Sequence, residues 1–220
     1  MRSQDGLVLL LILIIVFCSL AFFWLAHAVA QDQTRPVDEW VIRAFREPGQ
    51  PAKPVGPFWL PGAVRDVTAL GSTAVLVLAL AAVAGLAALR RQYPAVWLLL
   101  GAMSGGLLLN YLLKRWIARP RPELALALVP VNDASFPSGH SLLATVVCLT
   151  LGALAAGWAG PRKVKVYIWC VAGFVSFLVG VSRIYLGVHY PTDVLAGWLV
   201  GLLWATVCWL VARGLPRRFP

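Results

Sequence analysis

A histidine and an aspartate near the end of the chain stand at a spacing that could support phosphoryl transfer. His189 precedes Tyr190 and Pro191. Because proline favours the first position of a helix, we expect a helix to begin there with Asp193 in its first turn. A carboxylate there can accept a hydrogen bond from one imidazole nitrogen and leave the other free to attack phosphorus. We predict His189 as a nucleophile and Asp193 as its partner, although Asp193 could instead only complement the helix dipole.

The sequence PSGH at 137–140 predicts the start of another helix beside an anion site. Ser138 supplies a hydroxyl, Gly139 lets the backbone approach a ligand closely, and the free N–H groups of a helix start bind anions. His140 would then lie next to the anion, where it could protonate the departing oxygen as a general acid. Since Ser-Gly-His is also a common helix cap, this motif alone gives weak support.

Lys114, Arg121 and Arg183 would supply the positive charge that a phosphate needs. Phosphoryl transfer requires neutralised equatorial oxygens, and the guanidinium fork offers two parallel hydrogen bonds. Each cation could instead reach lipid headgroups, which is the interpretation that we favour for Arg115 and Arg119. The predicted phosphate-binding set is Lys114, Arg121, Ser138, Gly139 and Arg183.

The elements that must position these residues are expected to be transmembrane helices. Of the 220 residues, 60% are hydrophobic and only 13% are charged, unlike an ordinary soluble domain. A span needs about 20 mainly apolar residues, and membrane strands would alternate apolar and polar residues, which these segments do not. Six segments qualify, at about 6 to 28, 67 to 89, 94 to 113, 139 to 157, 165 to 182 and 192 to 212. We predict an all-α polytopic membrane protein with six transmembrane helices in a single domain over 1–220.

The charges between these segments predict their orientation, because cytoplasmic connections carry an excess of Lys and Arg. One side has Asp5 as its one acid against nine cations: Arg2, Arg90, Arg91, Arg162, Lys163, Lys165, Arg213, Arg217 and Arg218. We expect that side and both termini to be cytoplasmic, with 31–66, 114–138 and 183–191 facing outward. The first segment also resembles a signal peptide, but its apolar core exceeds the roughly 7 to 15 residues typical of one, which favours a retained helix.

Within the outward connection 31–66, a short interfacial helix is predicted. Apolar residues recur at three-to-four spacing at Val37, Trp40, Val41, Ala44 and Phe45. The charged residues on its other faces are Asp38, Glu39, Arg43 and Arg46. Such a helix lies in the membrane interface, where we expect it to anchor the protein and where it could also guide a lipid substrate.

Three motifs in the region 114–193 together resemble the signature of the type 2 phosphatidic acid phosphatase family. They run from Lys114 to Arg121-Pro122, from Pro137 to His140, and from Ser182-Arg183 through His189 to Asp193. This family includes membrane lipid phosphatases and soluble relatives such as vanadium haloperoxidases. The resemblance implies the same roles as the residues themselves: His189 as a nucleophile that forms a phosphohistidine, Asp193 as its partner, His140 as general acid, and the five residues named above as phosphate ligands.

The expected function is hydrolysis of a lipid phosphate or pyrophosphate without a cofactor or a divalent metal, because the cations supply the charge. Undecaprenyl pyrophosphate is favoured, and phosphatidylglycerol phosphate, phosphatidic acid, diacylglycerol pyrophosphate and the 1-phosphate of lipid A remain possible. A lipid phosphotransferase could use the same intermediate, whereas a non-enzymatic lipid transporter would not need a nucleophile. We expect a bacterial inner membrane protein whose site faces the periplasm or outside. The net charge of +10 is explained by topology and an anionic substrate, and no nucleic-acid motif accompanies it.

Overall fold

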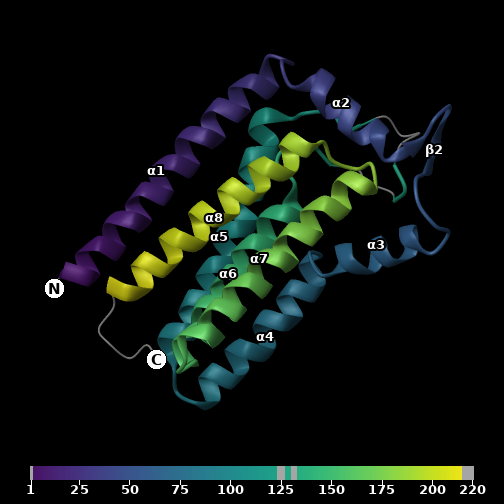
Figure 1. The fold of residues 1–220 in the computed structure, drawn as a ribbon. Helices are drawn as coiled ribbons and strands as arrows, with labels where there is room; N and C mark the ends of the chain where they lie inside the picture. The colour runs from purple at the N-terminus through teal and green to yellow at the C-terminus, as the bar shows by residue number, and fades with distance from the viewer. Residues whose placement is uncertain (1, 123–126, 130–132, 215–220) are drawn as a thin grey trace.

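The helices follow one another as a bundle with a short hairpin at one end (Figure 1). The computed structural model describes residues 2–122, 127–129 and 133–214. Its helices are α1 (Arg2–Ala30), α2 (Arg35–Ala44), α3 (Leu60–Ala69), α4 (Thr73–Leu89), α5 (Tyr93–Ile117), α6 (Gly139–Trp158), α7 (Arg162–Tyr185) and α8 (Pro191–Gly214). The strands β1 (Arg46–Glu47) and β2 (Gln50–Pro54) pair antiparallel.

The prediction of an all-α polytopic membrane protein is confirmed. Five helices of the described chain, α1, α5, α6, α7 and α8, are long and apolar enough to span a bilayer, and α3 with α4 qualifies as a sixth span bent by 47°. Each predicted segment therefore has a counterpart. The terminal residues 1 and 215–220 of the predicted domain lie outside the described residues.

The predicted segment 67 to 89 is divided between α3 and α4. Ser72 is the N-cap of α4, and its hydroxyl accepts the N–H of Val75 at 3.4 Å. A methyl group on Gly71 would lie 2.4 Å from a side-chain carbon of Val179, so the break packs directly against α7. The bend brings this turn to the end of the bundle where the predicted catalytic residues lie.

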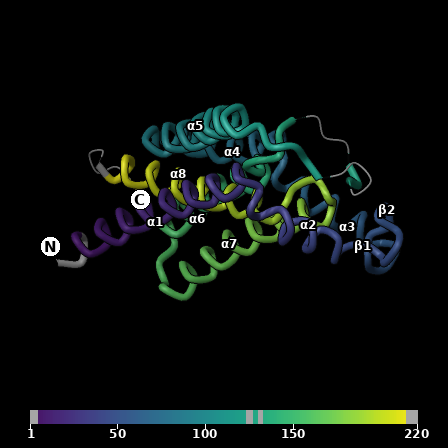
Figure 2. The backbone as a smooth tube through the Cα atoms, turned by 90° about the horizontal axis from the view of Figure 1, so that it is seen from above, coloured from purple at the N-terminus to yellow at the C-terminus, as the bar shows by residue number. Residues whose placement is uncertain are grey.

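Small residues bring α8 close to the central helix α6, which contacts α4, α5, α7 and α8. Figure 2 shows α4 and α5 on one side of α8 and α7 on the other. A methyl group on Gly197 would lie 2.7 Å from the Ser138 carbonyl oxygen, and one on Gly201 would lie 2.7 Å from Cβ of Thr145. Glycines at this four-residue spacing allow two membrane helices to approach closely. The starts of α6 and α8 are thereby held together, and the Ser138 N–H donates to the Asp193 carbonyl at 2.9 Å.

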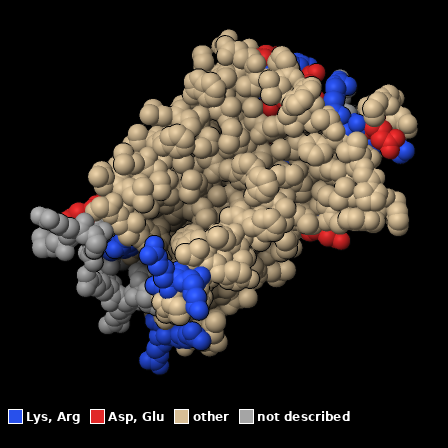
Figure 3. All heavy atoms as spheres, viewed as in Figure 1, with Lys and Arg blue, Asp and Glu red and all other residues tan. Residues whose placement is uncertain are grey.

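A group of basic residues with few acids lies at the end of the bundle opposite α2, whereas the basic residues at the α2 end are mixed with acids. The start of α1 and the end of α8 share that end (Figure 1). Figure 3 shows a group of Lys and Arg side chains there, where α4 ends and α7 begins with Arg162, Lys163 and Lys165, and further Lys and Arg side chains beside Asp and Glu at the opposite end. Arg217, Arg218 and the side chain of Arg2 lie outside the described residues. This distribution agrees with the predicted orientation, which stays a prediction.

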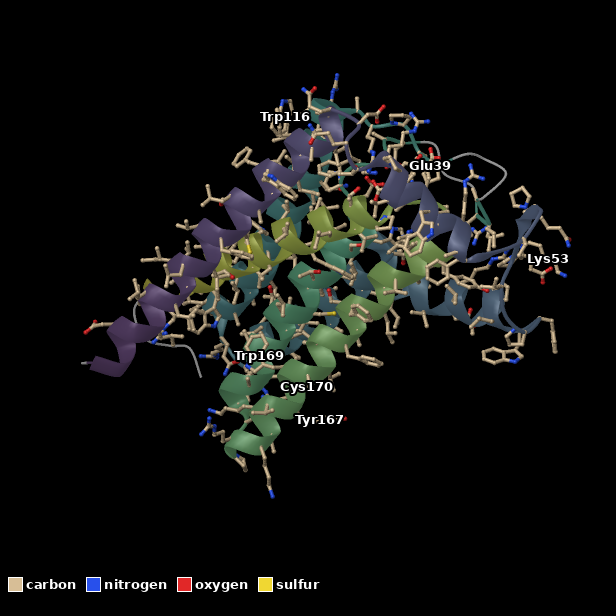
Figure 4. The ribbon with its side chains drawn as sticks, turned by 45° about the horizontal axis from the view of Figure 1, so that its top comes forward. Glu39, Lys53, Trp116, Tyr167, Trp169 and Cys170 are labelled. Atoms are coloured by element: carbon tan, nitrogen blue, oxygen red, sulfur yellow. The ribbon has the colours of Figure 1, made fainter. Side chains whose placement is uncertain are left out.

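The predicted interfacial helix corresponds to α2, and one of its charged residues, Asp38, points inward. Val37 and Trp40 are 63% and 71% exposed, whereas Asp38 and Ile42 are fully buried. Asp38 lies off the exposed apolar face, as predicted, but it contacts the protein interior rather than the membrane interface. In Figure 4, Glu39 of α2 lies at the same end of the molecule as Trp116 of α5, and Tyr167 and Trp169 of α7 lie toward the other end.

Candidate active site

A cavity of about 200 Å³ lies where the end of α5, the start of α6, the end of α7 and the loop before α8 converge. Its lining comprises Gly71, Thr73, Leu107, Asn110, Lys114, Arg121, Asp133, Gly139, His140, Leu143, Arg183 and His189. Six of the eight predicted site residues are thus brought to one cavity from separate elements. The remaining two, Ser138 and Asp193, are buried behind it.

His189 is held between Asp193 and the cavity. The ring is 2% exposed, and its Nδ1 lies 3.6 Å from Oδ2 of the fully buried Asp193. The Tyr190 N–H donates to the same oxygen at 2.8 Å, and the Ser135 hydroxyl also donates to it. On the other side of the ring, Nε2 lies 3.2 Å from Nη1 of Arg121. Nδ1 therefore faces the carboxylate, and Nε2 is available on the side of the cations.

Burial keeps the imidazole of His189 neutral. It lowers the pKa of His189 from 6.5 to about 4, and although Asp193 opposes this change, the positive charges of Arg121 and Arg183 add to it. At neutral pH the ring is uncharged, which is the state that can act as a nucleophile.

Lys114, Arg121 and Arg183, here called the cavity cations, surround the space next to His189. Lys114 and Arg121 both contact the carboxylate of Asp133. Arg121 is also fixed by bonds from Nη1 to the Val188 carbonyl at 2.6 Å and from Nε to the Asp133 carbonyl at 2.7 Å. Burial alone would raise the pKa of Asp133, but the hydrogen bonds from the two cations hold it at about 2. An anionic group of the protein thus already pairs with two of the predicted phosphate ligands.

Arg183 offers a donor that the protein leaves unused. The side chain is buried, and Nη1 donates to the Thr68 hydroxyl at 3.1 Å. Within the described part of the chain, its Nε has no hydrogen-bond partner although it is shielded from solvent. Leaving a buried donor without a partner is costly, particularly on a charged group. A phosphate oxygen in the cavity would satisfy this N–H.

The PSGH motif forms the start of α6, as its sequence predicts. Ser138 is the N-cap, and its hydroxyl accepts the Ser141 N–H at 3.5 Å and the Ser141 hydroxyl at 2.9 Å. That hydroxyl is therefore committed to the cap and does not line the cavity. A methyl group on Gly139 would come within 3.1 Å of the Asn110 side chain of α5, and the predicted approach of its backbone to a ligand stays a prediction. His140 is half-buried and lines the cavity.

Arg119 is not a surface residue that reaches lipid headgroups, and our interpretation of it was wrong. Its side chain is 6% exposed and bridges two fully buried carboxylates, with Nη1 2.7 Å from Oδ1 of Asp193 and Nη2 2.7 Å from Oδ2 of Asp38. Burial opposes the charge, but the two aspartates raise the pKa of Arg119 above its ordinary value. Arg115, by contrast, is exposed and donates to the Tyr111 hydroxyl at 2.8 Å.

Sequence reasoning missed four residues around the site: Asp38, Arg119, Asp133 and Ser135. The turn at Ala118, with a φ of 46°, directs the chain so that Arg119 points inward, and nothing in the local sequence signals this. For Asp133 and Ser135, the one available signal was that they lie just before the PSGH motif in the sequence. Residues that precede the start of a helix lie close to that start, and so close to the predicted anion site.

The chain matches the PAP2 superfamily model over residues 95–217. It is 36% identical to "Phosphatidylglycerophosphatase B" of Bacillus subtilis over 186 residues, which cover 84% of this chain and 87% of that protein. "Undecaprenyl-diphosphatase BcrC" of the same organism is 38% identical over 102 residues, which are 44% of this chain and 48% of the relative.

Solved structures agree with these matches. The crystal structure of a transmembrane PAP2 type phosphatidylglycerolphosphate phosphatase from Bacillus subtilis superposes with a TM-score of 0.81 at 32% identity, covering 93% of this chain and 98% of that one. Aquifex aeolicus LpxE gives a TM-score of 0.60 at 25% identity, covering 81% and 95%. The resemblance found in the three motifs is confirmed, and the chain belongs to the PAP2 superfamily as a membrane lipid phosphatase.

Proposed function

We propose that this protein removes phosphate from a membrane lipid through a phosphohistidine formed on Nε2 of His189. The observation that carries this proposal is the position of the neutral ring, with Nδ1 facing Asp193 and Nε2 facing the cavity cations. In this tautomer the lone pair of Nε2 accepts from Nη1 of Arg121, on the side where a phosphate would bind. The carboxylate of Asp133 between Lys114 and Arg121 supports the choice of an anionic ligand there.

Each step has a residue to perform it. Nε2 of His189 forms a bond to phosphorus while the bond from phosphorus to the lipid oxygen breaks, and His140 gives its proton to that oxygen. Water then attacks phosphorus, His140 takes up the proton, the nitrogen–phosphorus bond breaks and inorganic phosphate leaves. The cavity cations neutralise the equatorial oxygens in both steps, so preorganised charge supplies much of the acceleration. We infer from this that no divalent metal is required.

The relatives guide the choice of substrate. The protein similar over most of this chain is named for phosphatidylglycerol phosphate, and we propose that lipid as the first candidate. Undecaprenyl pyrophosphate, which we favoured from the sequence, is supported by the shorter match to BcrC and is the second candidate. In either case the tail stays in the bilayer and the headgroup enters at the end of the bundle next to α2. We propose that this end faces the outside of a bacterial cell membrane.

The test measures phosphate released by the purified full-length protein in detergent from phosphatidylglycerol phosphate, undecaprenyl pyrophosphate and dioctanoyl phosphatidic acid, with EDTA present. His189→Ala should remove the release, and His27→Ala, an exposed histidine at the end of α1, should not. Release that requires added metal would overturn the metal-independent mechanism. Release that continues in His189→Ala would overturn the nucleophile.

The intermediate can be tested directly with radiolabelled lipid phosphate and rapid quenching in alkali, where a phosphohistidine survives. We expect label on the unaltered protein and none on His189→Ala. Label that passes to a second lipid without a matching amount of free phosphate would instead identify a phosphotransferase. Lipid movement across reconstituted vesicles with no phosphate release would identify a transporter.

A further inference from the structure

The surface helix α2 carries a carboxylate into the interior at the start of α8. Oδ1 of Asp38 accepts the Thr192 N–H at 3.1 Å, and Oδ2 accepts the Thr192 hydroxyl at 2.7 Å. The first N–H groups of a helix lack partners within the helix, so Asp38 caps α8 from a distant part of the chain. Because His189 lies just before α8 and Asp193 in its first turn, this cap fixes the backbone that carries both.

Asp38, Arg119 and Asp193, here called the buried triad, form a continuous ion-paired chain. The two ends of the Arg119 guanidinium bind one carboxylate each at 2.7 Å, and the Tyr190 ring lies 4.2 Å from its central carbon. Such a fork has little freedom to rotate. Since Arg119 holds Oδ1 of Asp193, it fixes Oδ2 as the oxygen that faces His189.

The charges of the buried triad do not cancel. Arg119 with Asp193 alone would be a neutral pair, which would offer little to a histidine that becomes positively charged when its Nε2 bonds to phosphorus. Asp38 adds a second carboxylate, so two negative groups face one positive group and the triad carries one net negative charge. In a buried site with low effective dielectric constant, that charge stabilises a nearby cation. The other ionisable groups that line the cavity beside His189 are Lys114, Arg121, Asp133, His140 and Arg183.

We propose that Asp38 and Arg119 are positioning residues for the reaction: Arg119 orients Asp193 toward His189, and Asp38 restores the negative charge that Arg119 would otherwise cancel. This inference rests on the proposed phosphohistidine mechanism. It also makes α2 part of the active site, because the helix that exposes Val37 and Trp40 on its outer side contributes Asp38 on its inner side.

The experiment compares Asp38→Asn with Glu39→Gln in the full-length protein in detergent, using dioctanoyl phosphatidic acid as the substrate. Glu39 is the matched control, since it is the next residue of α2 and pairs with Arg35 on the surface at 2.9 Å. We expect Asp38→Asn to lower kcat by about tenfold or more with little change in KM, as is typical when a partner of a functional residue is lost. Glu39→Gln should leave both constants unchanged.

The pH profile separates positioning from a merely structural role. Removing one negative charge near His189 disfavours its cationic form, so the acid limb of kcat/KM should move to lower pH by about half a unit or more in Asp38→Asn. Adding Arg119→Met to Asp38→Asn restores the net negative charge of the triad and should return the limb toward that of the unaltered protein. A purely structural loss reduces the amount of folded enzyme and leaves the limb in place, which would overturn the proposal.

Two further outcomes keep the proposals distinct. If Asp38→Asn does not fold, Arg119→Lys tests the same arrangement, because lysine keeps the positive charge but cannot bind two carboxylates as the guanidinium fork does. In Arg119→Lys, kcat should fall by about fivefold or more and the acid limb should not move. An unchanged kcat would overturn the inference. If His189→Ala remains active, the proposed phosphohistidine mechanism itself fails. If His189→Ala is inactive while Asp38→Asn behaves like Glu39→Gln, the positioning role alone fails.

Discussion

Replacing Asp193 with asparagine should remove most of the activity while hardly changing the shape of the side chain. Oδ1 of Asp193 accepts from Arg119, and Oδ2 accepts from the Tyr190 N–H and the Ser135 hydroxyl. Asparagine has one acceptor oxygen, so one of these sides must meet an amide N–H that cannot accept. If the amide N–H faces His189, Nδ1 must accept, the proton moves to Nε2, and Nε2 can no longer attack phosphorus.

The size of the effect follows from the lost charge. The carboxylate lies 3.6 Å from Nδ1, and both groups are buried, so solvent screens them little. At an effective dielectric constant of about 20, unit charges at this distance attract by roughly 4 to 5 kcal/mol. Because phosphorylation places positive charge on His189, this loss corresponds to about a thousandfold decrease in kcat.

The assay is steady-state phosphate release from dioctanoyl phosphatidic acid by Asp193→Asn, with thermal unfolding in the same detergent as the check on folding. Asp66→Asn, an exposed acid in α3, is the control and should retain full activity. A decrease of less than about tenfold in kcat, with an unchanged unfolding temperature, would refute the assignment of Asp193 as the partner of the nucleophile.

The same structure makes three other predictions. With the pKa of His189 near 4 rather than 6.5, its nucleophilic form persists as the pH falls, so kcat/KM of the unaltered protein should stay level down to about pH 5; an acid limb centred near pH 6.5 would contradict this. Asp133→Ala removes a carboxylate that competes with phosphate for Lys114 and Arg121, so inorganic phosphate should inhibit this variant several-fold more strongly. Equal or weaker inhibition in the rate assay would count against that competition. Gly197→Ala places a methyl group 2.7 Å from the carbonyl oxygen of Ser138, the N-cap of α6, and should destabilise the fold by about 1 to 3 kcal/mol in thermal unfolding. Gly173→Ala is the control, because nothing lies within 4 Å of the added methyl group. Equal unfolding temperatures for the two variants would show that α8 can move aside.

The spans could be predicted because their apolar length is a property of the local sequence. The break between α3 and α4 could not, because it depends on contacts between distant segments. Gly71 lies against Val179 of α7, and neither residue identifies the other in the sequence. Ser72 is a good N-cap, but a single serine within a long apolar segment is also compatible with an unbroken helix.

The signature residues of the site could be predicted, and the residues that support them could not. The sequence of a short amphipathic helix shows that one face is polar, but it does not show whether water or protein contacts that face. In α2 the outer side carries Val37 and Trp40, so Asp38 turns inward. Arg119 was misassigned for a related reason, since the backbone turn at Ala118 decides its direction. Asp133 has no motif of its own and is recognised only from its contacts with the cations.

The two sides of His189 carry opposite charges, and each matches a charge that the proposed phosphohistidine mechanism would produce. The three cavity cations face one carboxylate, that of Asp133, so a phosphate that displaces it would replace one anion with another at the same cations. On the other side, the buried triad has one net negative charge, which suits a histidine that is neutral before attack and cationic after it. Exchanging the two sides would repel the phosphate and destabilise the intermediate. In the proposed mechanism, the direction of phosphoryl transfer would be set by which ring nitrogen of His189 faces which side. For the same reason, a change at Asp38, on the surface helix α2, should change the rate of the reaction.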